Sequence, residues 1–580
     1  MLRGPSSIRV LKPLLTIAGT AGIIVTSLAT LRFGMLTLTI DILVKLLVTF
    51  AYTHGLSSVR GRLQKAKVEE FHSQAEATSN PEQDVFAEKV DNFDTRSSSS
   101  ATEYADGPRM TATVVGWRED EELYRTCLRG FAFDPQCGPV IAGIDGDTEA
   151  DEDMLKTFLS VFPDGHVVRL KEPLSQTLDR YMLSANLGDF EDEQNCKFVM
   201  DHVSSAIRSA IAEQLFPQGI KNIQALCVIQ PHRSKKDILF TALSFASIIS
   251  EELGFDYLFS TDSDSAIMPG AMSEMTRMFE SDTNVGGVSG HLRFSHPQPT
   301  FLSRMTASHY WFEQEISKAQ GSIFGATECQ PGPCAAFRVS ALKSVLVPWL
   351  CQRVFGHRTG SFLLDIDPVT NEDRHLTTRI LWAGYTVHYA HKAIVYTDAP
   401  NNFTAWVKQQ VRWSRVTMIE TLWYPWMVNR LYPWHIYNIL KARSMPLLVF
   451  MSITSCALGL ETPTPITVAV LADVFCMYAL QVVYLVHVSA DFATRSDIIW
   501  LVPSIAWFFL MMPAIVVWSL VTIQDDSWGN IPRGSLGTKG GKEMIQPRAM
   551  TGIKHIGFMI VWIGVILVAV GRVVFSLWRA

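Results

Sequence analysis

The sequence predicts a mixed, mainly parallel α/β domain fused to an α-helical membrane region. Apolar, β-branched runs such as Thr111–Val115 and Val140–Ile144 are each followed by a polar turn and a helix-like segment. That order is typical of a parallel sheet whose site lies at the strand ends. Long apolar blocks at both ends of the chain, such as Leu14–Leu31, approach the ~20 residues that a bilayer span needs.

The N-terminal region predicts a transmembrane hairpin over residues 1–58. A second apolar run, Leu36–Tyr52, follows the first almost at once, with no clear cleavage site between them, which favours retained helices over a signal peptide. Basic residues flank the pair on both sides, so the positive-inside rule predicts that both ends lie in the cytosol. Residues 59–108 are polar and serine-rich and are expected to form a linker.

Charge and cysteine content exclude some classes of function. The formal net charge of −6 gives no indication of nucleic-acid binding. The nine cysteines have irregular spacings without a metal-finger pattern, which predicts reduced thiols in a cytosolic environment.

The stretch Tyr257–Ala266 is the centre of the predicted site. A short apolar run, characteristic of a buried strand, ends in Asp262 and Asp264, separated by one serine. Carboxylates at the carboxyl end of a strand lie where a ligand crevice forms, and two hard oxygen ligands suit Mg²⁺ or Mn²⁺ together with substrate phosphates. Taken alone, such a pair is more often part of a surface turn. The other motifs in the chain favour the metal site.

Other strand ends have polar groups suited to a nucleotide. Trp117 follows the first strand and is able to stack on a base, and Asp145 follows the second and is able to accept from a nucleobase or ribose. The segment from Pro231 to Lys236 places cations after a third strand, which suits a diphosphate or, alternatively, a solvated turn. The acidic region 164–201 is interpreted as an insertion.

Three later motifs complete the predicted site. The rigid turn around Cys334 would let a sugar approach the backbone, with the thiol packing in the wall rather than acting as a nucleophile. Glu372 and Asp373 open a helix, at the positive end of its dipole. Arg412 and Trp413 lie in a helix-like stretch and suit phosphate and sugar, although Trp near a membrane is commonly an interfacial anchor.

The order of these motifs, WRED, DGD, QPHRSKK, DSD, GPC, EDRHLT and QQVRW, resembles the processive, membrane-integrated family 2 glycosyltransferases, in particular hyaluronan synthases and chitin synthases. The resemblance implies a GT-A-type domain over residues 109–415 that uses a UDP-sugar donor, a growing polysaccharide acceptor and Mg²⁺ or Mn²⁺. It implies Asp373 as the general base, with metal ligands Asp262 and Asp264. The catalytic group then comprises Asp373, Glu372, Arg412, Trp413 and Gln409. The substrate-binding group comprises Trp117, Glu119, Asp145, Lys235, Asp262, Cys334, Arg374, Trp528 and Arg533.

The C-terminal part predicts interfacial helices over residues 416–444 and a transmembrane region over 445–580. Trp528 and Arg533 resemble the gating motif of hyaluronan synthases, in a loop over 524–552 that must face the cytosol to meet UDP. Because Pro503 and Pro513 break or kink helices, the apolar block Ile498–Ile523 is expected to lie at the interface or re-enter, which leaves five spans.

These features together predict a multi-pass plasma-membrane enzyme with a cytosolic catalytic domain. It would extend a β-linked polysaccharide from a UDP-sugar, with UDP-GlcNAc favoured and UDP-GlcA a possible second donor, and thread the product outward. One alternative is non-processive transfer of a single sugar to a lipid carrier. Another is an inactive membrane scaffold or transporter, which the retained aspartates disfavour.

Overall fold

A computed structural model describes residues 47, 109–132, 134–187, 192–215, 219–295, 299–351, 372–398, 400–423, 433–460, 480, 495–523 and 545–579. Apart from Leu47, the predicted N-terminal hairpin and linker lie outside these residues, as does the part of the predicted gating loop from 524 to 544. The last residues assigned to that loop, 545–552, instead form the start of a helix.

The α/β domain is built on one nine-stranded sheet with the order β3-β4-β2-β1-β5-β8-β7-β9-β6. Strands β3, β4, β2, β1 and β5 are parallel, whereas β8 pairs antiparallel with both β5 and β7. The predicted mixed, mainly parallel sheet is therefore confirmed. The strands are β1 (Met110–Gly116), β2 (Cys137–Asp145), β3 (His166–Arg169), β4 (Ala225–Gln230), β5 (Tyr257–Asp262), β6 (Ala266–Ile267), β7 (Val285–Ser295), β8 (Ala335–Arg338) and β9 (Thr386–Asp398).

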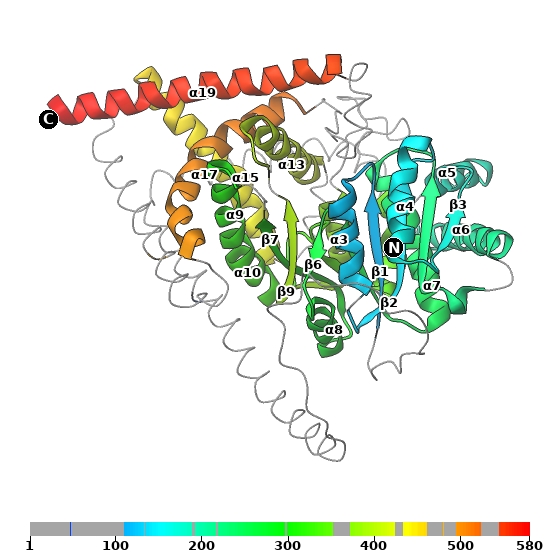
Figure 1. Cartoon of the computed structure of the whole chain (residues 1–580). Coiled ribbons are helices and arrows are strands. Elements are labelled where there is room, and N and C mark those ends of the chain that lie inside the picture. Colours follow the sequence, from blue (N-terminus) through cyan, green and yellow to red (C-terminus); the bar gives the residue numbers. More distant parts are fainter. Residues whose placement is uncertain are drawn as a thin grey trace, which may run out of the picture.

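Helices cover both faces of this sheet (Figure 1). One apolar cluster joins the sheet to α3 (Glu121–Ala132), α4 (Glu152–Val161) and α8 (Ala271–Ser281). The other joins it to α5 (Leu174–Ser184), α6 (Glu193–Gln214), α7 (Lys235–Leu253), α11 (Val339–Cys351) and α12 (Glu372–Trp382). Helix α7 is almost wholly buried because the sheet packs on one side of it and helices on the other.

The interpretation of residues 164–201 as an insertion is wrong. This segment contains β3, which pairs in parallel with β4, together with α5 and the start of α6. Val168 of β3 and Leu178 of α5 are fully buried in the sheet's core. An edge strand needs only a short apolar run, so the acidic surface residues around it hid its periodicity.

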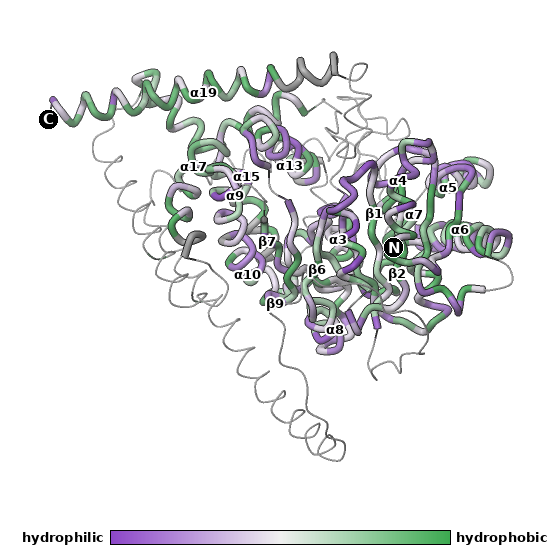
Figure 2. Tube along the Cα trace, viewed as in Figure 1, coloured by the Kyte–Doolittle hydropathy of each residue, from purple (hydrophilic) through white to green (hydrophobic). Residues whose placement is uncertain are grey.

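A predominantly apolar layer of helices lies beyond β7 and β9. Its members are α9 (Phe301–Phe312), a π-helix (Glu313–Lys318), α10 (Ala319–Ile323), α13 (Phe403–Trp423), α15 (Pro433–Leu458), α17 (Arg495–Val521) and α19 (Ile545–Arg579). The first three, α9, the π-helix and α10, contact these two strands. Trp406 of α13, Phe508 of α17 and Trp562 of α19 share one apolar core. Figure 2 shows how strongly hydrophobic α17 and most of α19 are compared with the α/β domain.

One expectation for this layer needs correction, and the predicted boundary at residue 445 falls within a helix. Pro503 and Pro513 lie inside α17, which continues unbroken for 27 residues, so the prolines do not interrupt it. Helix α15 likewise starts at Pro433 and runs through the predicted boundary at residue 445, with Pro446 inside it. Each proline removes one amide donor and one helical bond, a loss that packing against neighbouring helices offsets.

Within the described residues, two helices are long and apolar enough to cross a membrane, Ile499–Val521 and Ile553–Arg579. The first packs closely against α9 and α13, and Ser504 donates a hydrogen bond to the backbone carbonyl of Met305 in α9 (2.7 Å). The location expected for this segment, at the interface or re-entrant, stays a prediction.

Candidate active site

The candidate site lies where the direction of the sheet changes. Strands β1 and β5 run side by side to their carboxyl ends, where Val115 is the register partner of Asp262. The next strand, β8, is antiparallel to β5, and the turn that precedes it crosses in front of these ends. Helices α7 and α12 begin at the same place, with Lys235 and Glu372 as their first residues. Strand ends, a turn and two helix N-termini thus converge on one pocket.

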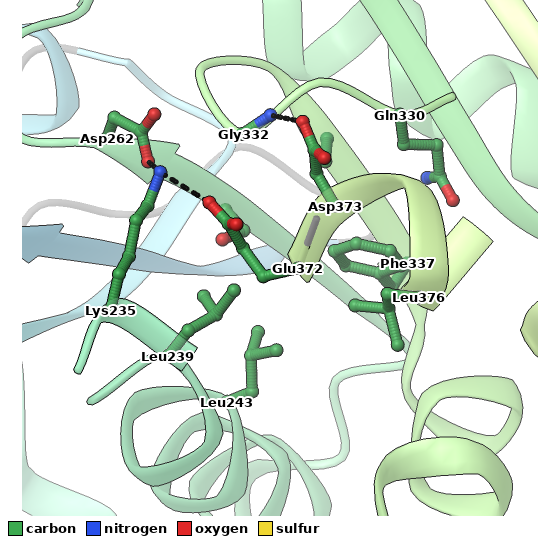
Figure 3. A pocket seen from close by; sticks show the side chains of 12 residues that line it. Lys235, Leu239, Leu243, Asp262, Gln330, Gly332, Phe337, Glu372, Asp373 and Leu376 are labelled. Carbon is green, nitrogen blue, oxygen red and sulfur yellow. Dashed lines mark hydrogen bonds and ion pairs between the residues drawn. The ribbon is translucent and has the colours of Figure 1, made fainter. Parts of the chain in front are cut away.

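Lys235 joins two carboxylates at the centre of this pocket (Figure 3). Its Nζ lies 2.8 Å from Oδ1 of Asp262 and 2.9 Å from Oε1 of Glu372. The Glu372 side chain is only 4% exposed, so its charge requires this partner. Leu239 and Leu243 of α7 form an apolar floor beneath the lysine. The lysine therefore fixes the positions of residues from β5 and α12 relative to α7.

The charges in the pocket are set by burial and by their neighbours. Burial lowers the pKa of Lys235, but Asp262 and Glu372 more than offset this and hold it protonated. Burial raises the pKa of Asp262, Lys235 opposes this increase, and the neighbouring Asp264 adds to it. Together these effects bring the pKa to about 6. Burial acts in the same direction on Glu372, but Lys235 and then Arg412 outweigh it, so the pKa of Glu372 is lowered. Glu372 is therefore the carboxylate whose ionised form the pocket favours.

Asp373 is oriented by two backbone amides. The N–H of Gly332 donates to Oδ2 (3.2 Å) and the N–H of Arg374 donates to Oδ1 (2.6 Å). Burial, and then the charge of Glu372, raise the pKa of Asp373. Adjacent carboxylates with opposite pKa shifts are a common arrangement for acid–base chemistry, in which the group with the raised pKa exchanges the proton.

The turn before β8 approaches the aspartates closely because it contains a glycine. A Cβ on Gly332 would lie 2.8 Å from Oδ2 of Asp262, nearer than real contacts permit. Behind the turn, the Nε2 of Gln330 donates to the backbone carbonyls of Val288 and Ala336, which ties the turn to β7 and β8. The pocket, about 320 Å³ with its mouth included, thus has a rigid wall on this side.

Cys334 is buried in this wall. Its sulfur packs against Gly290 of β7, where a Cβ would lie 2.2 Å away. Burial raises the pKa of the thiol to about 12, so it is not a thiolate at neutral pH. These contacts favour the packing role predicted from the sequence.

A second part of the site lies at the ends of β1 and β2. Asp145 is buried there and accepts from Gln230 Nε2 and from the backbone N–H of Arg233, both at 3.2 Å. Trp117 is partly exposed beside it, and the ring of His232 stacks on Trp117 with centroids 4.3 Å apart. Glu119, two residues on, accepts a hydrogen bond from Ser263 Oγ (3.3 Å), next to the aspartate pair.

The remaining predicted site residues come from the helical side. Arg412, in α13, is close enough to contribute to the lowered pKa of Glu372, and Trp413 packs edge-on against Tyr310 at 5.8 Å. Gln409 lies one turn earlier on the same helix. Arg374 binds Glu328 at 3.1 Å and is not among the residues that line the pocket. Trp528 and Arg533 lie outside the described residues.

The side chains at the end of β5 suit a divalent cation for which the protein supplies only some of the ligands. Asp262 and Asp264 offer hard carboxylate oxygens from one strand end, and their mutual repulsion would be relieved by Mg²⁺ or Mn²⁺. Among the described residues, no group of three or more His, Cys, Asp or Glu side chains is placed to bind a metal. The other ligands of such an ion would therefore come from the diphosphate and water.

Two features of the site were missed in the sequence. His232 was included only in a basic turn, and no local pattern indicates that its ring covers Trp117. The lysine bridge to Glu372 joins separate helices, so it becomes visible only in the fold. The structure places Lys235, which was assigned to the diphosphate, beside Asp262.

Comparison with known proteins identifies related chains. A family model described as chitin synthase matches residues 243–549. Hyaluronan synthase 2 of Xenopus laevis is 24% identical over 80% of this chain and 74% of its own length. Hyaluronan synthase 1 of Xenopus laevis is 26% identical over 57% of this chain, and human hyaluronan synthase 3 is 26% identical over 59%. The alignments with these two span 52% and 56% of the relatives' own lengths.

Among solved structures, a mannosyltransferase from Pyrobaculum calidifontis, in complex with GDP-Man and Mn²⁺, aligns at 15% identity. The alignment covers 72% of this chain and 87% of that one, with a TM-score of 0.35. A similarity at this level supports no conclusion about this chain.

Proposed function

The chain belongs to the chitin synthase family of glycosyltransferases, and we propose that it is an inverting, processive enzyme that polymerises a β-linked polysaccharide from a UDP-sugar. The observation that supports this most directly is the pocket in which Lys235 joins Asp262 to Glu372 while two backbone amides orient Asp373. The domain is of GT-A type, with the aspartate pair at the end of β5.

Asp373 acts as the general base in this proposal. The pKa of Asp373 is raised toward neutral pH, and a general base is most effective when its pKa lies near the working pH. As the acceptor hydroxyl oxygen bonds to the anomeric carbon, the bond from that carbon to the donor phosphate breaks, and the proton passes to Asp373. Attack from the side opposite the leaving group inverts the configuration, so no protein nucleophile is needed. The buried, protonated thiol of Cys334 agrees with this.

Charge neutralisation helps UDP to leave. The ammonium of Lys235 is held in the pocket, and Arg412 adds positive potential from α13. Preorganised cations of this kind stabilise charge that develops in the transition state. Asp262 and Asp264 would hold the Mg²⁺ or Mn²⁺, which, when bound, supplies further positive charge to the diphosphate.

Processive synthesis and export are proposed from the arrangement of the helical layer. Helices α9 and α13 share an apolar core with α15, α17 and α19. Arg412 of α13 also contributes to the lowered pKa of Glu372, so α13 links the pocket to the apolar region. We place the enzyme in the plasma membrane as a multi-pass protein, with the catalytic domain in the cytosol and the product moving outward. The names of the relatives favour UDP-GlcNAc as donor, with UDP-GlcA as a possible second one.

Product size under controlled donor supply tests this proposal. The purified full chain would be incubated in detergent with Mn²⁺ and radiolabelled UDP-sugars, singly and in pairs, and the products separated by size. Long polymer at low total turnover is expected from processive synthesis. Product from UDP-GlcNAc alone would indicate a chitin-like polymer, and a requirement for both donors would indicate hyaluronan. Products with a single added sugar would contradict processivity and support transfer to a lipid carrier.

A further inference from the structure

His232 contacts both groups that were assigned to the nucleobase. Its ring lies nearly parallel to that of Trp117, with an interplanar angle of 13° and a centroid distance of 4.3 Å. Its Nδ1 lies 2.8 Å from Oδ2 of Asp145. An aromatic ring on Trp117 with a nitrogen pointing at a carboxylate is the arrangement that a base with a ring N–H, such as uracil, would adopt there.

The hydrogen bonds of Asp145 leave little room for a second ligand. Oδ1 already accepts from Gln230 and from the backbone N–H of Arg233. Oδ2 is therefore the oxygen on which a base would depend, and His232 occupies it. Asp145 is buried and fixed in position, whereas the His232 side chain is 47% exposed. Of the two, the histidine is the one with space to move.

We propose that His232 is a gate on the nucleobase site, occupying one face of Trp117 and the Oδ2 oxygen of Asp145 until the donor displaces it. This rests on the proposed function, because it assumes a nucleoside diphosphate donor. Trp117 itself stays in place through Arg118, whose guanidinium lies 5.2 Å from the ring centroid and binds Asp151 at 3.0 Å. When the donor binds, the ring and N–H of the nucleobase take the place of the ring and N–H of His232.

Protonation of His232 favours the closed gate. The hydrogen bond to Asp145 raises the pKa of His232 against a smaller opposing effect of burial, and the charge of Asp151 acts in the same direction as Asp145. The cations nearby are Arg118 and Arg233, which bind Asp151 and the acidic residues of α5 and α7 respectively. A pKa that is higher in the closed state means that the gate closes more firmly as the pH falls and is released as the pH rises through it.

Equilibrium binding of UDP, measured by calorimetry on the purified full chain with Mn²⁺, tests the gate. His232→Gln removes the titrating ring and keeps a hydrogen-bonding side chain. His202→Gln is the matched control, because His202 also stacks on a partner ring, Tyr181, at 4.0 Å and has no part in the site. At about pH 6 we expect His232→Gln to bind UDP roughly fivefold more tightly than the wild type, a difference that shrinks by about pH 8. His202→Gln should match the wild type.

Kinetics give a second readout. If His232 is a gate, the KM for the donor should rise at acid pH in the wild type but not in His232→Gln. The pH dependence of kcat should be the same in the two proteins. Weaker UDP binding by His232→Gln at both pH values would overturn the gate and make His232 part of the base platform. An identical pH dependence of binding in the wild type and the variant would also overturn it. No UDP binding by any of the three proteins would overturn the donor site itself.

Discussion

Removing the ammonium of Lys235 should destabilise the folded protein as well as inactivate it. In Lys235→Met, Asp262 and Glu372 remain side by side in the pocket without the cation that lies 2.8 and 2.9 Å from them. Breaking a buried ion pair by deleting one partner costs about 3–5 kcal/mol. Protonation of one carboxylate limits this loss. The pKa of Asp262 is about 6 with Lys235 present and rises when this cation is removed. Its protonation near pH 7.5 therefore costs at most about 2 kcal/mol at ~1.4 kcal/mol per pH unit.

The expected loss of stability is therefore about 2–4 kcal/mol, or a drop in Tm of roughly 5–15 °C at ~2–4 °C per kcal/mol. Below pH 6 the loss should shrink, because Asp262 is then protonated in the wild type as well. The assay is thermal unfolding in detergent at about pH 7.5 and about pH 5.5.

Lys343→Met is the matched control for this measurement. Lys343 pairs with Glu251 at 2.6 Å on the surface, where the carboxylate is 43% exposed. Such pairs contribute less than about 1 kcal/mol, so its Tm should change by no more than a few degrees. Equal Tm values for the two variants at the higher pH would refute the assigned role of the Lys235 bridge.

Three further substitutions and a pH profile probe the pocket. Gly332→Ala forces a methyl group against Asp262 and should lower kcat by roughly tenfold or more in a UDP-release assay, whereas unchanged kcat would contradict the close approach. Cys334→Ser should retain turnover, and Cys334, whose burial raises its pKa to about 12, should resist iodoacetamide at neutral pH; rapid labelling would contradict its burial. Asp264→Asn should raise the Mn²⁺ concentration for half-maximal activity about tenfold or more, and an unchanged metal titration would remove Asp264 from the ligands. The acid limb of the kcat profile should lie above the range of a free aspartate because the pKa of Asp373 is raised, and a limb near pH 4 would contradict that.

Local signals were enough to predict much of the fold and the site. The apolar run before Asp262 did form β5, and the acidic pair at Glu372 did open α12. Both predictions depend on a few neighbouring residues, because strand periodicity and helix-start chemistry are local properties. The parallel order of the first strands followed from the same alternation of strands and helices.

The features that could not be predicted depend on tertiary contacts. The bridge from Lys235 to Glu372 and the stacking of His232 on Trp117 join segments that only the fold brings together. Pro513 lies inside a continuous helix because neighbouring helices pack around α17, an environment that the sequence does not display. The charges near β3 concealed an edge strand whose burial comes from α6 and β4.

The most direct test of the account compares UDP release and UDP binding in the wild type and Asp373→Asn. The substitution keeps the size of the side chain and leaves Lys235, Asp262 and Glu372 in place. The account predicts that the variant binds UDP with the affinity of the wild type but releases UDP from a UDP-sugar at least about a hundredfold more slowly. Unchanged release by Asp373→Asn, with intact binding, would contradict Asp373 as the base.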